Sequence, residues 1–221
     1  MINITHLTQK DRESILLNDI NLTVPQKTVF GIFCEKKAER TALLEAISGA
    51  CTDFDGDISI CGHNIKTDRI DAQLLIGYMP EDMPFYNNMT VIEYLSFIAD
   101  AKQLDFEKAQ KNIKNILAST SLLTIKDAII SNLGPAGRVR LGIAQAMVSD
   151  PSVVLFGNPT YGLKKNETQE IFKLIRKLSR SKSVIITSDD PQALSFCDSG
   201  TVLTLGQLDT DIKKVMERGA K

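Results

Sequence analysis

Gly31-Ile-Phe-Cys-Glu-Lys-Lys-Ala-Glu-Arg-Thr-Ala-Leu-Leu44 lies where a run of β-forming residues gives way to a helical pattern. Residues 28–33 are rich in β-branched and aromatic side chains, which favour a strand. Apolar residues then recur at helical spacing over 41–48, and Gly49 follows as a helix-ending residue. The sequence therefore predicts a strand, a short loop and a helix at this point.

The predicted loop has the length of a phosphate-binding loop but not its residues. The pattern G-x-x-x-x-G-K-[ST] uses glycines to turn backbone N–H groups toward phosphate and a lysine to reach the terminal phosphates. The glycine positions are Cys34 and Glu39, the lysine position is Arg40, and Thr41 keeps the hydroxyl. Glu39 would place a carboxylate at the helix N-terminus, where it would compete with phosphate.

Two of these residues still allow weak nucleotide binding. Arg40 offers a cation that suits phosphate oxygens, and Thr41 offers a hydroxyl that could face a magnesium ion. The alternative that we favour is a solvated arginine, paired with Glu39 or Glu35, and a threonine that caps the helix. For Cys34, a small buried replacement for glycine is favoured over a thiol of low pKa.

Bulk composition excludes several classes of protein. Lys plus Arg number 26 and Asp plus Glu number 27, so the formal net charge is −1 and offers nucleic acid no broad positive field. The four cysteines form no C-x-x-C pair, and the two histidines, His6 and His63, add no zinc spacing. We therefore expect no metal site and a reduced cytosolic compartment. The longest apolar runs are only strand-sized, and the first residues show no charged segment followed by an apolar one, so we expect neither a membrane span nor an export signal.

The order of predicted elements indicates an α/β fold. Strands are predicted at 16–24, 28–33, 57–61, 74–79, 152–156, 183–187 and 201–205, and helices at 41–48, 91–102, 106–119, 138–148, 167–178 and 191–196. Alternating strands and helices imply a mainly parallel sheet that is covered on both faces. The early strands predict an N-terminal antiparallel β lobe, and the helices from 91 to 148 predict a helical insertion.

Several segments resemble the ATP-binding subunit of ABC transporters in order, over almost the entire chain. They are Ile76-Gly-Tyr-Met-Pro-Glu81, Met89-Thr-Val-Ile-Glu-Tyr-Leu95, Leu141-Gly-Ile-Ala-Gln-Ala146, Asp150-Pro151 and Asn158-Pro-Thr-Tyr-Gly-Leu163. The resemblance implies an ABC-type P-loop NTPase fold in a single domain, 1–221. Its α/β core with the β lobe would comprise 1–87 and 150–221, and its helical subdomain about 88–149.

The resemblance fails at the positions that carry the family's ATP chemistry. The aromatic residue that stacks on adenine falls near Asp11, and the Walker B aspartate and catalytic glutamate positions are Gly157 and Asn158. Neither can act as an anionic metal ligand or a general base. The switch histidine position is Asp189, which with Asp190 we interpret as a helix cap before Pro191 rather than a catalytic dyad.

The signature loop and the two-site arrangement are affected as well. The family's signature loop, L-S-G-G-Q, corresponds here to Leu133-Gly134-Pro135-Ala136-Gly137-Arg138-Val139, with Gly134 and Ala136 at the serine and first glycine and Val139 near the glutamine. The D-loop aspartate position is Lys164. Members of this family bind ATP between the P-loop of one subunit and the signature loop of the other. A homodimer of this chain would therefore combine two defective half-sites, and ATP with magnesium is expected only as a weak or structural ligand.

A partner surface is predicted beside the Q-loop position, which here is Glu81. In the family this neighbourhood receives a helix of the permease, and the residues Met83, Phe85, Tyr86 and Met89 suit an apolar helix-in-groove contact. The alternative for single residues such as Phe85 and Met89 is the core of the helical subdomain.

The resemblance and the replacements together predict a pseudo-ATPase. It would act as a structural or regulatory subunit at the cytoplasmic face of a membrane, bound to a permease subunit and, in one version, to an active ATPase paralogue. One alternative is the non-hydrolysing half of a heterodimeric transporter ATPase that still binds ATP. Another is a soluble adaptor without a permease.

Overall fold

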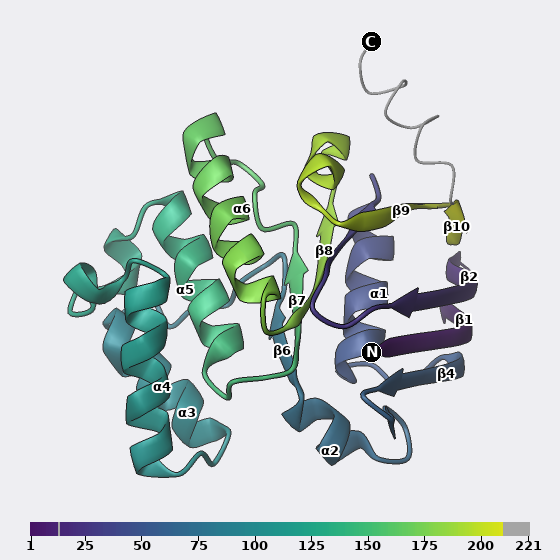
Figure 1. The fold of residues 1–221 in the computed structure, drawn as a ribbon. Coiled ribbons are helices and arrows are strands. Elements are labelled where there is room, and N and C mark those ends of the chain that lie inside the picture. Colours follow the sequence, from purple (N-terminus) through teal and green to yellow (C-terminus); the bar gives the residue numbers. More distant parts are fainter. Residues whose placement is uncertain (13, 210–221) are drawn as a thin grey trace.

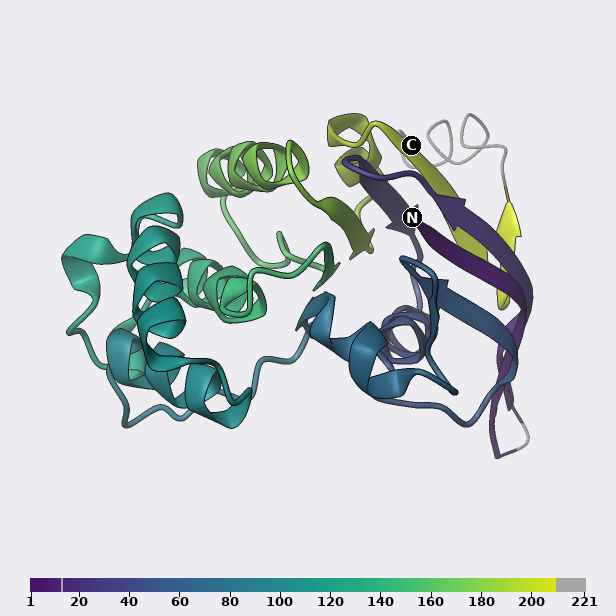
Figure 2. The same cartoon turned by 60° about the horizontal axis from the view of Figure 1, so that its bottom comes forward.

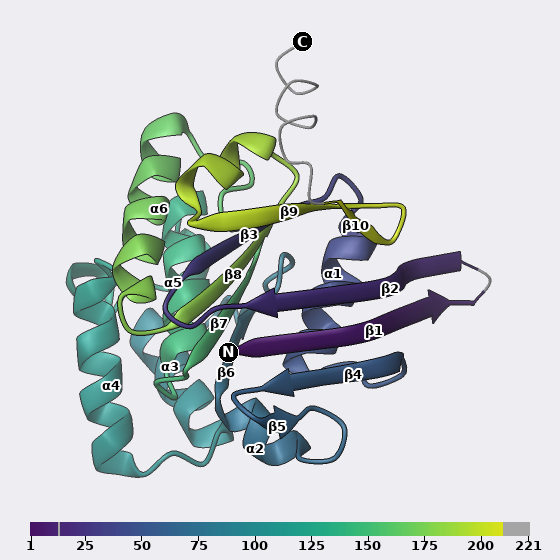
Figure 3. The ribbon, with the colours of Figure 1, turned by 45° about the vertical axis from the view of Figure 1, so that its right-hand side comes forward.

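A computed structural model of the chain describes residues 1–12 and 14–209. Its strands form two sheets, of four and six strands (Figures 1 and 3). The four-stranded sheet is antiparallel and has the order β2 (Ser14–Val24), β1 (Ile2–Asp11), β4 (Asp55–Ile60), β5 (His63–Asn64). The six-stranded sheet has the order β10 (Gln207–Asp209), β9 (Ser199–Thr204), β3 (Val29–Phe33), β8 (Ser183–Ser188), β7 (Val153–Gly157), β6 (Ile76–Met79).

The larger sheet is parallel apart from β10, which pairs antiparallel with β9. Every residue of β3, β7 and β8 is buried, as expected for strands that are covered on both faces. Successive residues alternate between two cores: Val153 and Leu155 pack with the antiparallel sheet and α1 (Lys37–Ser48), whereas Val154 and Phe156 pack with the helices on the other face. The fold class predicted from the sequence is confirmed.

The helices on that second face are mostly consecutive in the chain. They are α3 (Val91–Ala101), α4 (Phe106–Ser119), α5 (Pro135–Met147) and α6 (Lys165–Ser179). Figure 2 shows α3, α4 and α5, in teal, to one side of the sheets. α3 begins with a capping box in which the Thr90 side chain accepts from the Glu93 N–H and Glu93 accepts from the Thr90 N–H.

Some boundaries predicted from the sequence are wrong. α1 begins at Lys37, four residues before the predicted start, so Thr41 lies inside the helix rather than at its cap. Leu74 ends a short helix, α2 (Arg69–Leu74), and β6 begins only at Ile76. The helix at Pro191–Phe196 is a 3₁₀ helix, and β1, β5 and β10 were not predicted. Gly49, at a φ of 70°, ends α1 as predicted.

The parallel sheet brings distant loops together at one edge. The segments that follow β3, β6, β7 and β8 all leave from the carboxyl ends of parallel strands. In open α/β sheets this edge is where ligands bind, because the loops and helix N-termini converge there. The edge gathers Cys34, Glu81, Asn158 and Asp189, which lie far apart in the sequence.

Candidate functional site

The loop between β3 and α1 is folded around a side chain of its own. The Arg40 guanidinium donates from Nη1 to the carbonyl oxygens of Cys34, at 2.6 Å, and Glu35, at 2.9 Å. The Cys34 N–H in turn donates to the Ser188 carbonyl, at 2.9 Å, which ties the loop to β8. At these positions the loop presents carbonyl oxygens to a cation, whereas a phosphate-binding loop presents N–H groups to an anion.

Arg40 forms a buried ion pair with Glu81. Nε lies 3.0 Å from Oε2 and Nη2 lies 2.8 Å from Oε1, a bidentate arrangement. The two side chains are 3% and 13% exposed, and the Asp189 carboxylate lies 4.0 Å from Nη2. The expectation of a solvated arginine paired with Glu39 or Glu35 is wrong, because the guanidinium is buried against Glu81 and contacts Glu35 only through its backbone.

Asn158 extends this pair into a network. Its Nδ2 lies 3.4 Å from Oε1 of Glu81, and its Oδ1 lies 3.4 Å from the Ser188 hydroxyl, both long for hydrogen bonds. Its backbone N–H donates to the Thr187 carbonyl at 3.0 Å. Asn158 has a φ of 42°, a left-handed conformation that asparagine adopts more readily than most residues. The Asn158 side chain therefore lies between a charged neighbour, Glu81, and a neutral one, Ser188.

A narrow gap adjoins one side of the ion pair. This gap, bounded by Thr41, Tyr78, Gly157, Thr187 and the ion pair itself, leaves ≈ 0 Å³ for a water molecule. A Cβ at Gly157 would lie 2.7 Å from the Glu81 backbone nitrogen, so this strand end and the segment after β6 are in close contact. Burial raises the pKa of Tyr78, and the Glu45 and Glu81 carboxylates raise it further, so the phenol stays protonated.

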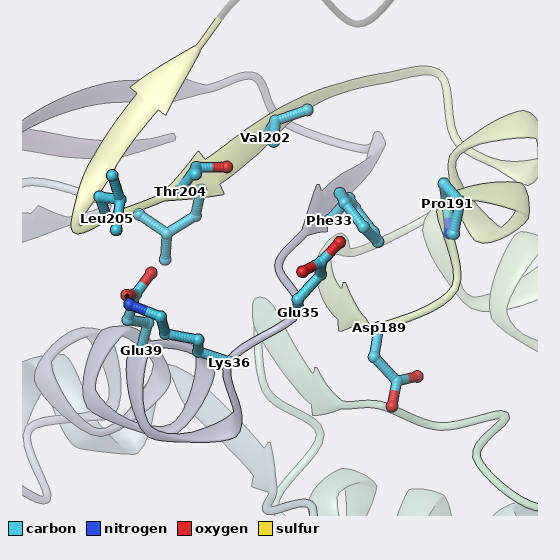
Figure 4. A pocket seen from close by; sticks show the side chains of 10 residues that line it. Phe33, Glu35, Lys36, Glu39, Asp189, Pro191, Val202, Thr204 and Leu205 are labelled. Carbon is cyan, nitrogen blue, oxygen red and sulfur yellow. Dashed lines mark ion pairs between the residues drawn. The ribbon is translucent and has the colours of Figure 1, made fainter. Parts of the chain in front are cut away.

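Glu39 lies on the other side of the loop and is also buried, at 3% exposure. One of its oxygens lies 3.1 Å from Lys36 Nζ (Figure 4). The other accepts from the Gly206 N–H at 3.3 Å. The carboxylate thus joins the start of α1 to the turn between β9 and β10. The pKa of the Cys34 thiol is raised to about 12, mainly by burial and secondly by the Glu39 charge. This agrees with the interpretation of Cys34 as a small buried replacement for glycine.

A pocket of about 350 Å³ opens beside Glu39. Its walls include Phe33, Pro191 and Leu205, and Figure 4 shows the carboxylates of Glu35, Glu39 and Asp189 distributed along it. Among the described residues of the lining, Lys36 is the one cation. Three carboxylates beside the start of α1 make this pocket unfavourable for a phosphate group.

Other residues singled out in the sequence lie outside this cluster. Asp11 ends β1 on the surface, and Lys164 precedes α6 as its N-terminal cap. Gly134 is the N-cap residue of α5, and Pro135 is the first residue of that helix. Asp190 accepts from the Gln192 N–H at 2.9 Å, which confirms its interpretation as a helix cap.

The candidate partner segment divides into buried and exposed residues. Phe85 is buried and meets the Tyr94 ring edge-on at 5.4 Å between centroids, while Met83 and Met89 are partly buried against the same core. Tyr86 is 52% exposed and packs edge-on against Phe97, with centroids 5.2 Å apart. Of the four Met and aromatic residues predicted for partner contact, Tyr86 is therefore the exposed one.

Sequence reasoning missed two groups at the site. Ser188 supplies the carbonyl that holds Cys34 and a hydroxyl beside Asn158, and Thr187 closes the gap next to Arg40. Neither belongs to a motif, and only the pairing of β8 with β3 and β7 brings them to this edge. Among the described residues, no three His, Cys, Asp or Glu side chains are placed to hold a metal ion.

Comparison with known proteins identifies the family. Residues 17–161 match the ABC transporter family, which is well over half of the chain. The chain belongs to the ABC transporter ATP-binding cassette family. No helix in residues 1–12 and 14–209 has the length and apolar character that crossing a membrane requires.

The matched relatives in this family are distant in sequence. The chain is 24% identical over 220 residues to an uncharacterized ABC transporter ATP-binding protein, YybJ of Bacillus subtilis (strain 168), with 99% of each chain covered. It is 26% identical to the methionine import ATP-binding protein MetN of Mannheimia succiniciproducens, of which it spans only 58%. It spans 22% of ABC transporter A family member 8 of Dictyostelium discoideum.

Solved ABC cassettes share the fold. The structure of cbiO1 from Clostridium perfringens, described as part of the ABC transporter complex cbiONQ, matches with a TM-score of 0.85 at 22% identity, covering 99% of this chain and 92% of that one. A nucleotide-free ATP-binding cassette from an ABC transporter matches with a TM-score of 0.87 at 16% identity, covering 98% and 95%. At these identities the similarity shows the fold alone.

Proposed function

We propose that this ABC cassette is a pseudo-ATPase that serves as a structural or regulatory subunit of a membrane-associated ABC-type complex. The observation that carries the proposal is the Arg40–Glu81 ion pair. The guanidinium is held by Glu81 and by two carbonyl oxygens of the β3–α1 loop, and the gap beside the pair has no room for a water molecule. The residues present do not fit a magnesium-bound triphosphate, since the loop carbonyls already bind a guanidinium.

The chemistry of the neighbouring positions supports the same proposal. Gly157 and Asn158 supply no carboxylate for a metal ion or for a general base. Removing both functions costs several kcal/mol of transition-state stabilisation, a rate loss on the order of 10³-fold or more. The Glu39 carboxylate, buried at the start of α1, adds repulsion toward any phosphate.

The partner in this proposal is a permease subunit, bound from the cytoplasmic side beside the segment after β6. The exposed ring of Tyr86 and its neighbour Phe97 supply an apolar surface there. In the division that we propose, with a core of 1–87 and 150–221 and a helical subdomain of about 88–149, Tyr86 belongs to the core and Phe97 to the helical subdomain, so this surface would span the boundary between them. Membership of cbiO1 in the cbiONQ complex supports a transporter assembly by analogy.

Calorimetry with magnesium-ATP tests the catalytic half of the proposal. The purified full chain is expected to show no heat of binding at micromolar to millimolar magnesium-ATP, no ATP-dependent dimer by light scattering, and no phosphate release above the protein-free rate. Micromolar binding of magnesium-ATP would overturn the proposal. Affinity purification from native membranes tests the other half, because a permease subunit should co-purify.

A second candidate function is the non-hydrolysing half of a heterodimeric transporter ATPase. The observation that favours it is the open start of α5, where Gly134 is the N-cap residue and a Cβ there would meet no atom within 4 Å. Free N–H groups at an open helix start can face an anion held by a partner. Mutating only the paralogue's catalytic glutamate should then abolish the ATPase activity of the co-purified pair.

A further inference from the structure

The pocket beside Glu39 lies next to the point where the described chain ends. The last residue of β10, Asp209, lies opposite Val202 of β9. Val202 lines the pocket, and the two residues of a cross-strand pair share one face of the sheet. The Thr201 hydroxyl donates to the Asp209 carbonyl at 2.9 Å, which holds the end of β10 against β9. The chain beyond Asp209 therefore starts beside the wall of this pocket.

One part of the pocket lining is apolar and includes an exposed leucine. Leu205 is 73% exposed and has a φ of 51°, in the first position of the two-residue turn between β9 and β10. Asparagine, aspartate or glycine is usual at that position, because both central residues of such a turn have positive φ. Leu205 therefore gives the pocket an apolar group that its backbone position does not favour. The apolar part of the lining consists of Phe33, Pro191, Val202, Leu203 and Leu205.

The charged part of the lining is acidic. Glu39 is buried and already bonded to Lys36, so the carboxylates that an occupant can meet are those of Glu35 and Asp189. Glu35 is exposed, and within residues 1–12 and 14–209 its side chain has no hydrogen bond or ion pair. The Asp189 side chain is 35% exposed, with Arg40 at 4.0 Å. Figure 4 shows the Glu35 carboxylate between Leu205, at one end of the lining, and Pro191, at the other. The pocket therefore suits an occupant that brings both apolar and cationic side chains.

Residues 210–221 have both kinds of side chain in their sequence. The segment reads Thr210-Asp-Ile-Lys-Lys-Val-Met-Glu-Arg-Gly-Ala-Lys221. Its four basic and two acidic side chains give it a net charge of +2, although the whole chain has a formal net charge of −1. Ile212 and Lys213 follow Asp209 by three and four residues, and four extended residues span up to about 14 Å. They can therefore reach the pocket from the end of β10.

We propose that the start of segment 210–221 docks in this pocket, with Ile212 against the apolar lining and with Lys213 and Lys214 at Glu35 and Asp189. A volume of about 350 Å³ has room for a few side chains, so the rest of the segment would lie outside. The docked segment would cover Glu35 and hold the chain end against the β3–α1 loop. The inference goes beyond the pseudo-ATPase proposal, and its tests use no nucleotide, so either proposal can fail without the other.

Carbodiimide cross-linking of the full chain tests the contact without any substitution. The reagent condenses a lysine ammonium with a neighbouring carboxylate to form an amide, with loss of one water molecule. We expect a cross-link from Lys213 or Lys214 to Glu35 or Asp189, identified by peptide mass spectrometry. Mixing ¹⁴N-labelled and ¹⁵N-labelled protein before the reaction distinguishes a link within one chain from a link between two copies.

The structure supplies both controls for this reaction. Lys37 and Asp82 form an exposed ion pair at 2.7 Å and should be cross-linked in every sample. Glu107 is an exposed carboxylate in the first turn of α4, outside the pocket, and should not be linked to segment 210–221.

Hydrogen exchange with a charge reversal provides a second measurement. Amides of residues 211–217 in the full chain should exchange about tenfold or more slowly than in a free peptide of the same sequence. Glu35→Lys should remove this protection, whereas Glu107→Lys, the same change outside the pocket, should leave it intact. Combining Glu35→Lys with Lys213→Glu and Lys214→Glu should restore it, because opposite charges face each other again. Far-UV circular dichroism verifies that each variant is folded.

Four results would overturn the proposal. The first is no link from Lys213 or Lys214 to the pocket while Lys37 and Asp82 are linked. The second is linking only between isotopically different copies, which would make a second copy the occupant. The third is protection that Glu35→Lys leaves unchanged. The fourth is protection that appears only with phosphatidylserine vesicles, which would assign the basic segment to a membrane surface.

Discussion

Arg40 and Glu81 are joined by two charge-assisted hydrogen bonds, at 3.0 Å and 2.8 Å, across 41 residues of sequence. Their pairing connects the first turns of α1 to the segment that follows β6. The same guanidinium binds two carbonyl oxygens of its own loop. One side chain therefore holds the loop, the helix and the neighbouring strand end in a single arrangement.

Removal of Arg40 is expected to destabilise the protein strongly. Arg40→Ala leaves the Glu81 carboxylate buried without its partner, which costs about 3–5 kcal/mol in the free energy of unfolding. Lys37→Ala is the matched control, because it breaks an ion pair whose side chains are 51% and 84% exposed and is expected to cost at most about 1 kcal/mol. Urea unfolding measures the free energy of unfolding of both variants. Equal losses would show that the Arg40–Glu81 pair contributes no more than an exposed ion pair.

Filling Gly157 should also destabilise the fold. A Cβ there would lie 2.7 Å from the Glu81 backbone nitrogen, so Gly157→Ala is expected to lower the free energy of unfolding by about 1–3 kcal/mol. Gly137→Ala, inside α5, would meet its nearest atom at an ordinary 3.4 Å and should stabilise by about 0.5–1 kcal/mol through helix propensity. Opposite signs in thermal unfolding are the expected result, whereas a neutral Gly157→Ala would contradict the close contact.

Stability should fall at alkaline pH, in part because of Cys34. Its pKa is raised from 9.0 to about 12, mainly by burial, so above pH 9 the unfolded state loses the thiol proton before the native state does. The free energy of unfolding then declines between about pH 9 and 12, by up to about 1.4 kcal/mol per pH unit for this thiol. Urea unfolding at pH 7, 9, 10 and 11 should show a shallower decline for Cys34→Ala.

Cys61→Ala is the control for this titration, because Cys61 is exposed. Its pH profile should match that of the unaltered chain. Iodoacetamide provides a second readout at pH 8, where Cys61 should be alkylated in the native protein and Cys34 only after unfolding. Early alkylation of Cys34 would refute its burial.

The proposed permease contact is tested at Tyr86. Tyr86→Glu places a charge on the exposed ring position and should reduce co-purification with the permease subunit at least tenfold, while the thermal unfolding temperature changes little. Phe106→Glu, at a residue that is 71% exposed at the start of α4, is the matched control and should leave co-purification intact. Loss of co-purification in both variants, or in neither, would argue against a specific contact at Tyr86.

Much of the fold could be predicted because it depends on local patterns. The predicted helix over 106–119 coincides with α4, and the strand over 183–187 falls within β8. β1 was missed because its alternation breaks between Ile4 and Leu7, where Thr5 and His6 are both exposed and His6 has a φ of 52°. The start of α1 was missed because Lys37, Ala38 and Glu39 precede its apolar periodicity.

By itself, the sequence determined the fold class and the identity of the residues at each motif position, because hydrophobic periodicity and motif order are local properties of the chain. Only the tertiary structure decided what Arg40 does. Its partner Glu81 and the carbonyls that it binds are brought together by the parallel pairing of β3, β8, β7 and β6. Burial removes water from both charged groups, and the bidentate geometry together with the loop carbonyls supplies the hydrogen bonds that the guanidinium would otherwise make to solvent.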